Sequence, residues 1–85
     1  MYKVEIARTA RRDLDRIMGP DLSRLEQHII GLGTGPRPHG AKKLQDKLHR
    51  IRVGNWRVLY AVQDLERVVT ILRVLRRNER TYRNL

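Results

Sequence analysis

The chain lacks cysteine and phenylalanine, and it contains a single tryptophan. Without cysteine, disulfides and thiolate metal sites are excluded, and a reducing, cytoplasmic environment is expected. Valine, leucine and isoleucine must build most of the core, because large aromatic side chains are so few. No apolar run approaches the roughly 20 residues that span a bilayer, and the first residues hold no apolar signal core. We therefore expect neither membrane insertion nor export.

Acidic residues are also scarce, since 9 Asp and Glu face 19 Lys and Arg, for a formal net charge of +10 in 85 residues. Such an excess predicts long-range attraction to polyanions, either nucleic acid or an acidic protein. Few carboxylates lie near the arginines, which argues against a two-metal nuclease. The three histidines have no metal-ligand spacing. We therefore expect no metal and no cofactor.

The N-terminal half of the sequence predicts a short strand followed by two helices. Residues 2–6 alternate between polar and apolar side chains, which is typical of a strand. Thr9 is a good N-cap for a first helix, Gly19-Pro20 breaks it, and Asp21 or Ser23 can cap a second helix. Apolar residues recur at helical spacing in both segments: Ala10, Leu14 and Ile17 in the first, and Leu22, Leu25, Ile29 and Leu32 in the second.

The C-terminal half predicts strands. Residues 31–40 are too rich in glycine and proline for regular structure and are interpreted as a surface connector. Residues 44–60 predict a β-hairpin with a turn at Gly54-Asn55, and residues 68–74 predict a central strand. The expected fold class is α+β, in one domain over residues 1–85. It comprises an N-terminal strand, a two-helix hairpin and a three-stranded antiparallel meander, forming one small sheet with helices on one face.

The hairpin carries the most informative pattern of the chain. Arg50 and Arg52 alternate with Ile51 and Val53, so one face buries aliphatic side chains and the other presents guanidinium groups. Arg57 can join the second face across the hairpin. We expect the helices to leave this face exposed. Guanidinium forks fit phosphate oxygens in a planar, bidentate way, so the arginines form a candidate phosphodiester site. The same pattern also fits a solvated basic face.

Other side chains extend the candidate site or lie beside it. Tyr82 can stack on a base or transfer a proton as a phenol, or it can pack on the sheet edge. His49 is expected on the packed face with Ile51, because strand neighbours point to opposite faces. The cations predicted to contact RNA are Lys47, Arg73, Arg76 and Arg80.

Three segments of the chain resemble the RelE/ParE superfamily of bacterial and archaeal toxins. They are KLQDKLHRIRVGNWRVLYAV, VVTILRVLRRNERTY and the N-terminal pattern Val-x-Ile-x-x-Thr-Ala-x-x-Asp-Leu. RelE-type members cut messenger RNA in the ribosomal A site, through attack of a ribose 2′-OH on the adjacent phosphate. ParE-type members share the fold and poison DNA gyrase. The resemblance implies a toxin of a type II toxin-antitoxin system that forms a hetero-oligomer with a small acidic, RelB-like antitoxin. It also implies that the ribosome and mRNA are partners.

The resemblance implies a catalytic role for five residues. The family's basic pair on its second strand matches Arg50 and Arg52, and its transition-state arginine matches Arg57. A later arginine matches Arg77, and the C-terminal tyrosine matches Tyr82. Fixed guanidinium groups stabilise the extra negative charge of a pentacoordinate phosphorane.

The chain departs from the family at the basic pair. The best-known RelE toxins have lysines where this chain has Arg50 and Arg52, and arginine is a poor general base. Proton abstraction is then left to water, the RNA or Tyr82. On sequence alone three functions stay open: a ribosome-dependent endoribonuclease, a gyrase inhibitor without a catalytic site, and a basic nucleic-acid-binding module.

Overall fold

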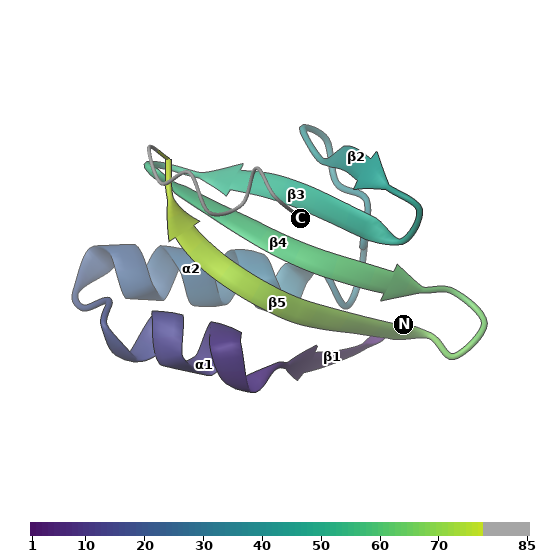
Figure 1. Cartoon of the computed structure of the whole chain (residues 1–85), viewed down its shortest axis with the longest axis horizontal. Coiled ribbons are helices and arrows are strands. Elements are labelled where there is room, and N and C mark those ends of the chain that lie inside the picture. Colours follow the sequence, from purple (N-terminus) through teal and green to yellow (C-terminus); the bar gives the residue numbers. More distant parts are fainter. Residues whose placement is uncertain (78–85) are drawn as a thin grey trace.

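The computed structural model describes residues 1–77, which form one five-stranded sheet with two helices against it (Figure 1). The elements in chain order are β1 (Lys3–Ile6), α1 (Arg8–Asp15), α2 (Pro20–Gly31), β2 (Lys42–Gln45), β3 (Leu48–Val53), β4 (Trp56–Gln63) and β5 (Val68–Arg76). The strand order is β1-β5-β4-β3-β2. The predicted α+β fold class is confirmed. Neither helix of the described part is long and apolar enough to cross a membrane.

Two features of the sheet were not predicted. β1 pairs with β5 in parallel, so the sheet is mixed. The segment before the hairpin forms a separate strand, β2, which turns through Asp46 and Lys47 and pairs with β3. The predicted start of the hairpin at residue 44 was therefore wrong, because the arginine-bearing strand begins at Leu48. β2 has only four residues and one large apolar side chain, so periodicity could not separate it from β3.

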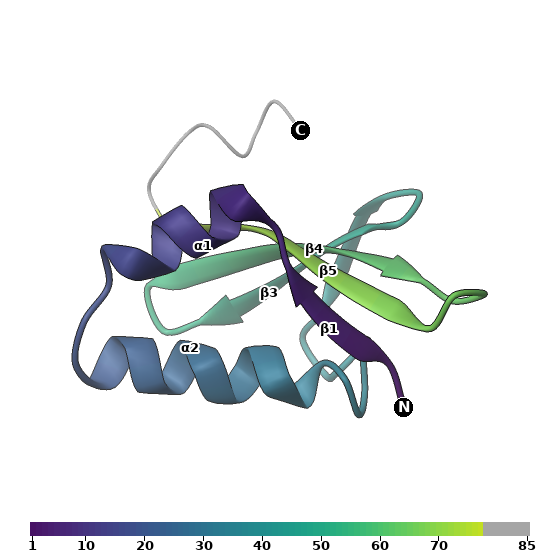
Figure 2. The same ribbon diagram turned by 90° about the horizontal axis from the view of Figure 1, so that it is seen from below.

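The core lies between the sheet and the helices. α2 crosses one face of the sheet, while α1 continues from β1 along the edge of β5 (Figures 1 and 2). Both predicted apolar stripes are buried there, although Leu22 is only partly covered. They meet aliphatic side chains of β3, β4 and β5. The helices therefore pack on one side, and the other face of the sheet carries no helix of the described residues.

α1 covers the edge of β5 beyond the end of β1. The Thr9 hydroxyl donates to the Leu72 carbonyl (2.7 Å), and the Asp13 carboxylate accepts from the backbone N–H of Val74 (2.9 Å). These side chains satisfy backbone groups at a sheet edge, where unpaired groups invite pairing with other chains. Thr9 is thus not the predicted N-cap. The N-cap of α1 is Ala7, and no side chain caps the helix.

α2 also begins without a side-chain cap. Its N-cap is Gly19, with φ 71°, and Pro20 follows in the first turn, where an absent N–H is tolerated. Neither Asp21 nor Ser23 makes the predicted cap. Asp21 instead accepts a hydrogen bond from the indole Nε1 of Trp56 (3.1 Å), which ties the start of α2 to β4.

The contacts of Asp13 predict a large loss of stability when it is replaced. Its carboxylate accepts two hydrogen bonds from Arg73 (2.8 and 3.2 Å) as well as the one from Val74, and its side chain is 10% exposed. Asp13→Ala removes this acceptor from a cation and a backbone N–H, so the free energy of unfolding should fall by about 2–3 kcal/mol. Urea denaturation followed by circular dichroism measures the change. Asp15→Ala, which replaces an exposed neighbour, should change the free energy of unfolding by less than about 0.5 kcal/mol. Equal effects would contradict the role of Asp13 at the edge.

Candidate functional site

A two-residue turn between β3 and β4 sets the register of the arginines. Gly54 has φ 60°, whereas Asn55 is not in the positive-φ region, the combination of a type II′ turn. The turn leaves Val53 opposite Trp56, and Arg52 opposite Arg57. Directly opposite residues lie on the same face of a sheet. Arg57 therefore joins the face of Arg52, as the alternation predicted.

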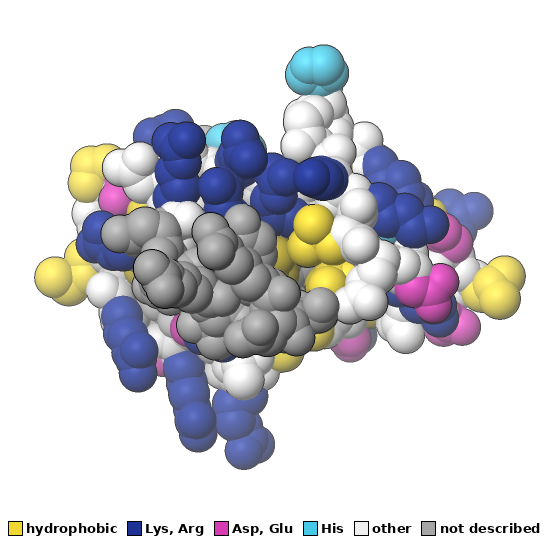
Figure 3. All heavy atoms as spheres, turned by 45° about the horizontal axis from the view of Figure 1, so that its top comes forward, with side chains coloured by type: hydrophobic (Ala, Val, Ile, Leu, Met, Phe, Trp, Pro, Cys, Tyr) yellow, Lys and Arg dark blue, Asp and Glu magenta, His cyan; other side chains and the backbone are white. Residues whose placement is uncertain are grey.

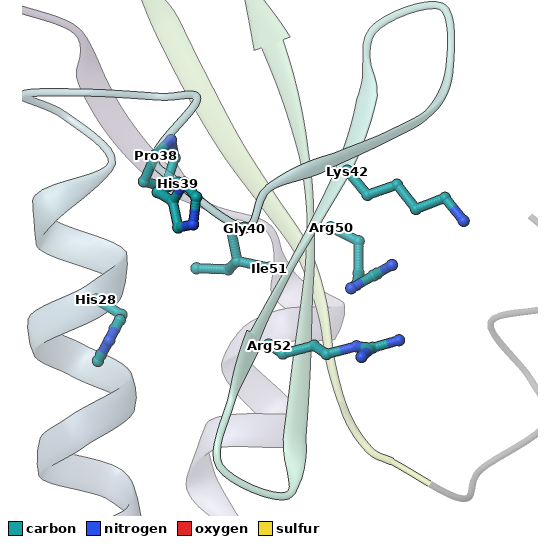
Figure 4. Close-up of a pocket in the computed structure, with 8 residues that line it drawn as sticks. All are labelled: His28, Pro38, His39, Gly40, Lys42, Arg50, Ile51 and Arg52. Carbon is teal, nitrogen blue, oxygen red and sulfur yellow. The ribbon is translucent and has the colours of Figure 1, made fainter.

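A second row of partners crosses the sheet beside this pair. Lys42 of β2 lies opposite Arg50, and Arg50 lies opposite Leu59. Lys42, Arg50 and Arg52 point to the same side of β3 (Figure 4). Lysine and arginine side chains gather over the β2 and β3 side of the molecule (Figure 3). Lys42 was not among the predicted site residues, because the short strand that carries it was not predicted. We call Lys42, Arg50, Arg52 and Arg57 the cationic face.

Two arginines of the cationic face are buried, contrary to the expectation of an exposed surface. Arg50 is 8% and Arg57 is 6% exposed, whereas Arg52 is exposed. Their cross-strand partners Leu59 and Leu75 are buried too. Arginine stems pack on such apolar neighbours while the head keeps its charge. Substituting Arg57 should therefore disturb packing as well as charge, and Arg52 is the cleaner probe of function.

Arg73 and Arg76, two of the predicted RNA-binding residues, have structural contacts. Arg73 reaches the edge of the sheet, where its guanidinium binds the carboxylate of Asp13. The guanidinium of Arg76 lies 4.9 Å from the ring centroid of Trp56. Trp56 packs against the core, so this contact is on the helix side of the sheet. Arg73 lies opposite Leu59, so its position on β5 is on the same side of the sheet as Arg50, but its guanidinium turns to Asp13 at the edge.

The remaining predicted residues are distributed along the chain. Arg77 donates its backbone N–H to the carbonyl oxygen of Asn55 (2.7 Å), which places it beside the β3–β4 turn. Lys47 lies in the β2–β3 turn, at the opposite end of β3 from Arg52. Arg80 and Tyr82 lie outside the described residues.

His49 lies on the packed face of β3, as predicted. It is 4% exposed, and its ring stacks on Tyr60 with centroids 5.6 Å apart. Its Nδ1 is 2.9 Å from the carbonyl oxygen of Lys47. Although His49 precedes Arg50 in the chain, it points away from the cationic face and cannot serve a ligand bound there.

Tyr60 also anchors the glycine- and proline-rich loop. Its hydroxyl donates to the carbonyl of Pro36 (2.7 Å), and burial raises the pKa of Tyr60 to about 12. Arg37 of the same loop forms two hydrogen bonds with Asp64 (3.2 and 2.9 Å). Hydrogen bonds from Arg37 and Tyr2 lower the pKa of Asp64, so this ion pair persists in mildly acidic solution. The predicted surface connector is therefore held against the sheet at two points.

A pocket of about 520 Å³ opens between this loop, α2 and β3 (Figure 4). β2 pairs with β3 only as far as Arg50, so the rest of this edge has no strand neighbour among residues 1–77. The lining residues come from α2, β2, β3 and the loop: His28, Pro38, His39, Gly40, Lys42, Arg50, Ile51 and Arg52. Three cations of the cationic face thus border a hollow of a size typical of small-ligand sites.

The chemistry available at this site is anion binding. Guanidinium groups stay protonated at any physiological pH and can stabilise negative charge, but they are poor bases. The pocket lining contains no Asp or Glu. Within residues 1–77, no three His, Asp or Glu side chains are placed to hold a metal ion. The site is suited to phosphate recognition rather than to proton abstraction.

Comparisons with known proteins agree with this fold. The model of the family described as ParE toxin of type II toxin-antitoxin system, parDE, matches residues 4–81. RelE1, a toxin homologue of Methanocaldococcus jannaschii, is 32% identical over 88 residues, covering 98% of this chain and 97% of that protein. The archaeal RelE-RelB complex of Pyrococcus horikoshii gives a TM-score of 0.83 at 26% identity, covering 92% of this chain and 97% of that chain. The toxin-antitoxin complex RelBE2 of Mycobacterium tuberculosis gives a TM-score of 0.78 at 31% identity, covering 89% of this chain and 98% of that chain.

Because the hydroxyl of Tyr60 is buried, we expect the protein to lose stability in alkaline solution. Its folded-state pKa is about 12, above the value of about 10 in an unfolded chain. The folded state therefore keeps the phenol proton to higher pH, and the free energy of unfolding should fall as pH rises from about 10 to about 12. Urea denaturation across this range should show the fall in the native sequence. Tyr60→Phe should remove most of it, and Tyr2→Phe should retain most of it. An unchanged dependence of the free energy of unfolding on pH in Tyr60→Phe would contradict the burial of this hydroxyl.

Proposed function

Because the chain belongs to the RelE/ParE superfamily of toxins of type II toxin-antitoxin systems, we propose that it is a ribosome-dependent endoribonuclease that cleaves mRNA in the ribosomal A site. The observation that carries this proposal is the cross-strand pair of Arg52 and Arg57 on the face without helices. Lys42 and Arg50 extend the positive charge beside this pair. Such an array fits the phosphates of an extended RNA strand.

In the proposed reaction, a ribose 2′-OH attacks the adjacent phosphorus and the bond from phosphorus to the 5′ oxygen breaks. The proton of the 2′-OH passes to water, and the 5′ oxygen takes up a proton from water as it leaves, so the products are a 2′,3′-cyclic phosphate and a 5′-OH. Arg52 and Arg57 bind the non-bridging oxygens, where negative charge grows in the transition state. Removing one such contact typically costs about 2.7–4 kcal/mol of barrier lowering. Arg50 and Arg77 hold the neighbouring phosphates, and Tyr82 is the phenol that the family resemblance assigns to the site.

The need for a ribosome follows from the absence of a strong base on the cationic face. Its arginines hold their protons, and His49 is buried on the opposite side of β3. The ribosome supplies the in-line arrangement of the 2′-OH and the leaving oxygen. Orientation of this kind can contribute several kcal/mol of barrier lowering. Free RNA, which samples many conformations, is accordingly a poor substrate.

A gyrase inhibitor is the second candidate, because the matching family model describes ParE toxin. Such an inhibitor acts through a protein surface and needs no array of guanidinium groups around one phosphate. The pairing of Arg52 with Arg57, beside Lys42 and Arg50, favours the ribonuclease.

We also propose a cytoplasmic hetero-oligomer with a small acidic, RelB-like antitoxin. The net charge of +10 favours an acidic partner. The similar solved proteins from Pyrococcus horikoshii and Mycobacterium tuberculosis are toxin-antitoxin complexes. Carboxylates placed over the cationic face would offset the repulsion between its positive charges and would also block the binding of RNA.

Single-turnover cleavage of message on programmed ribosomes tests the role of Arg52. Arg52→Ala should reduce the rate about 100- to 1,000-fold, because one transition-state contact is lost. Its melting temperature should change little, since an exposed charge contributes little to stability. Arg12→Ala, an exposed arginine of α1, is the matched control and should cleave at the native rate.

Two results of the cleavage assay would refute the proposal. One is full activity in Arg52→Ala. The other is rapid cleavage of free RNA that added ribosomes do not accelerate. Arg57→Ala should lose activity too, but with lower stability, because its side chain is buried.

Copurification tests the proposed antitoxin. The tagged chain, expressed from its native operon at low salt, should bring down a small acidic protein in a fixed ratio. Raising the ionic strength should weaken the complex, because part of the attraction is between exposed charges. Recovery of the chain alone, without a small acidic companion and without harm to the host, would count against this partner.

A further inference from the structure

We propose that a hollow between the end of α1 and the end of β5 is an anchor site for a glutamate or aspartate side chain of an acidic protein partner. The hollow has a volume of about 180 Å³. We call it the tryptophan pocket, and its lining includes the apolar residues Ile17, Trp56 and Val74 and the exposed cations Arg16 and Arg76. The inference rests on the proposed function, since it names a second place where the proposed antitoxin is held.

The tryptophan pocket lies on the helix side of the sheet, away from the cationic face. Trp56 of β4 lies opposite Arg76 of β5, and Val74 lies opposite Val58 of the core. Directly opposite residues share a face of the sheet. α1 runs along this edge of β5 (Figure 2). A side chain held in this pocket therefore does not by itself cover the cationic face.

The pocket carries positive charge that the described residues leave available. Arg16 and Arg76 are exposed, and within residues 1–77 neither forms a salt bridge with a carboxylate. Arg73 and Asp13 also line the pocket, but their charges offset each other through two hydrogen bonds (2.8 and 3.2 Å). A carboxylate that enters the pocket would thus meet two guanidinium groups, which bind carboxylates through charge-assisted hydrogen bonds.

The apolar part of the pocket is fixed before a ligand arrives. Ile17 and Val74 are buried. The indole Nε1 of Trp56 donates to Asp21 (3.1 Å), and the guanidinium of Arg76 lies 4.9 Å from the ring centroid. Little ordering is then required on binding. Tryptophan and arginine are also the residue types that most often dominate binding energy at protein interfaces.

The size and the surroundings of the pocket favour a protein side chain over an RNA strand. Its volume is below the roughly 300 Å³ at the low end of small-ligand sites, so it fits one side chain rather than a nucleotide. Asp15 precedes Arg16 in the chain, and Asp21 binds the indole of Trp56. Successive phosphates of an RNA strand would approach these carboxylates and be repelled. A single carboxylate on an apolar stem matches both the cations and the apolar lining.

Titration of the full isotope-labelled chain by NMR tests the anchor site with three probes: N-acetylglutamate methylamide, its glutamine counterpart and a short oligouridylate. Trp56 is the only tryptophan, so its indole N–H gives a single signal that reports on this pocket. The glutamate probe should shift this signal and bind at least about tenfold more tightly than the glutamine probe, because hydrogen bonds to a charged group are stronger. The oligouridylate should shift signals of the cationic face and leave the indole signal in place.

Three outcomes of this titration would overturn the proposal. They are an indole signal that the glutamate probe does not shift, equal affinities for the glutamate and glutamine probes, and an indole signal that the oligouridylate shifts at lower concentration than the glutamate probe. The last outcome would assign the pocket to RNA.

Two arginine substitutions separate the pocket from the general charge of α1. Arg16→Ala should weaken binding of the glutamate probe about tenfold, because one charged contact is lost. Arg12→Ala is the matched control, since Arg12 is an exposed arginine one turn earlier that does not line the pocket. It should bind the probe as the native chain does. Both variants should keep the native melting temperature, because exposed charges contribute little to stability. Equal affinities of the two variants for the probe would contradict the anchor site.

The copurified acidic protein gives the test with the partner itself. It should bind Arg16→Ala at least about fivefold more weakly than Arg12→Ala, while Arg16→Ala alone should cleave message on ribosomes at the native rate. Equal affinity of that protein for the two variants removes the anchor site and keeps the antitoxin. Slower cleavage by Arg16→Ala would assign the pocket to RNA and overturn the proposal. If no acidic protein copurifies, the proposed antitoxin is removed, and the glutamate probe alone decides the carboxylate site.

Discussion

The register of the β3–β4 hairpin is the constraint on which the candidate site depends. The two-residue turn at Gly54 sets Arg52 opposite Arg57, and Arg50 opposite Leu59. A slip of one residue would turn these arginines to the helices and the aliphatic residues of β3 to the other side. The apolar packing that stabilises the sheet is therefore the same packing that orients the cations. A site built on paired strands, rather than on a loop, holds its charges rigidly.

The cationic face combines two kinds of arginine. Arg50 and Arg57 are buried beside Leu59 and Leu75, so they belong to the packing of this side of the sheet as well as to its charge. Arg52 is exposed and can meet a ligand directly. Positive charges on neighbouring strands repel one another, and a bound anion relieves that repulsion. Both partners proposed for this face, RNA phosphates and an acidic antitoxin, would stabilise it in this way, and they would compete for it.

Local patterns predicted the arginine face and every element except β2, because alternation and helical spacing are properties of neighbouring residues. Features decided by distant contacts were missed or wrong. Thr9 and Asp21 have the chemistry of N-caps, yet each bonds to a strand far along the chain. The parallel pairing of β1 with β5 and the strand carrying Lys42 had no periodic signal. The pocket also has no motif, since its lining residues come together only when α2 and the loop fold against β3. The catalytic and RNA-binding roles of the arginines, and those of Arg80 and Tyr82, stay predictions.

The central claim is that the cationic face acts on RNA and not on DNA gyrase. The most direct test compares two effects of the same chain: primer extension on cellular transcripts after brief expression, and supercoiling by purified gyrase in the presence of the purified chain. We expect new 5′ ends within the translated codons of transcripts and undiminished supercoiling. Intact transcripts together with inhibited supercoiling would contradict it.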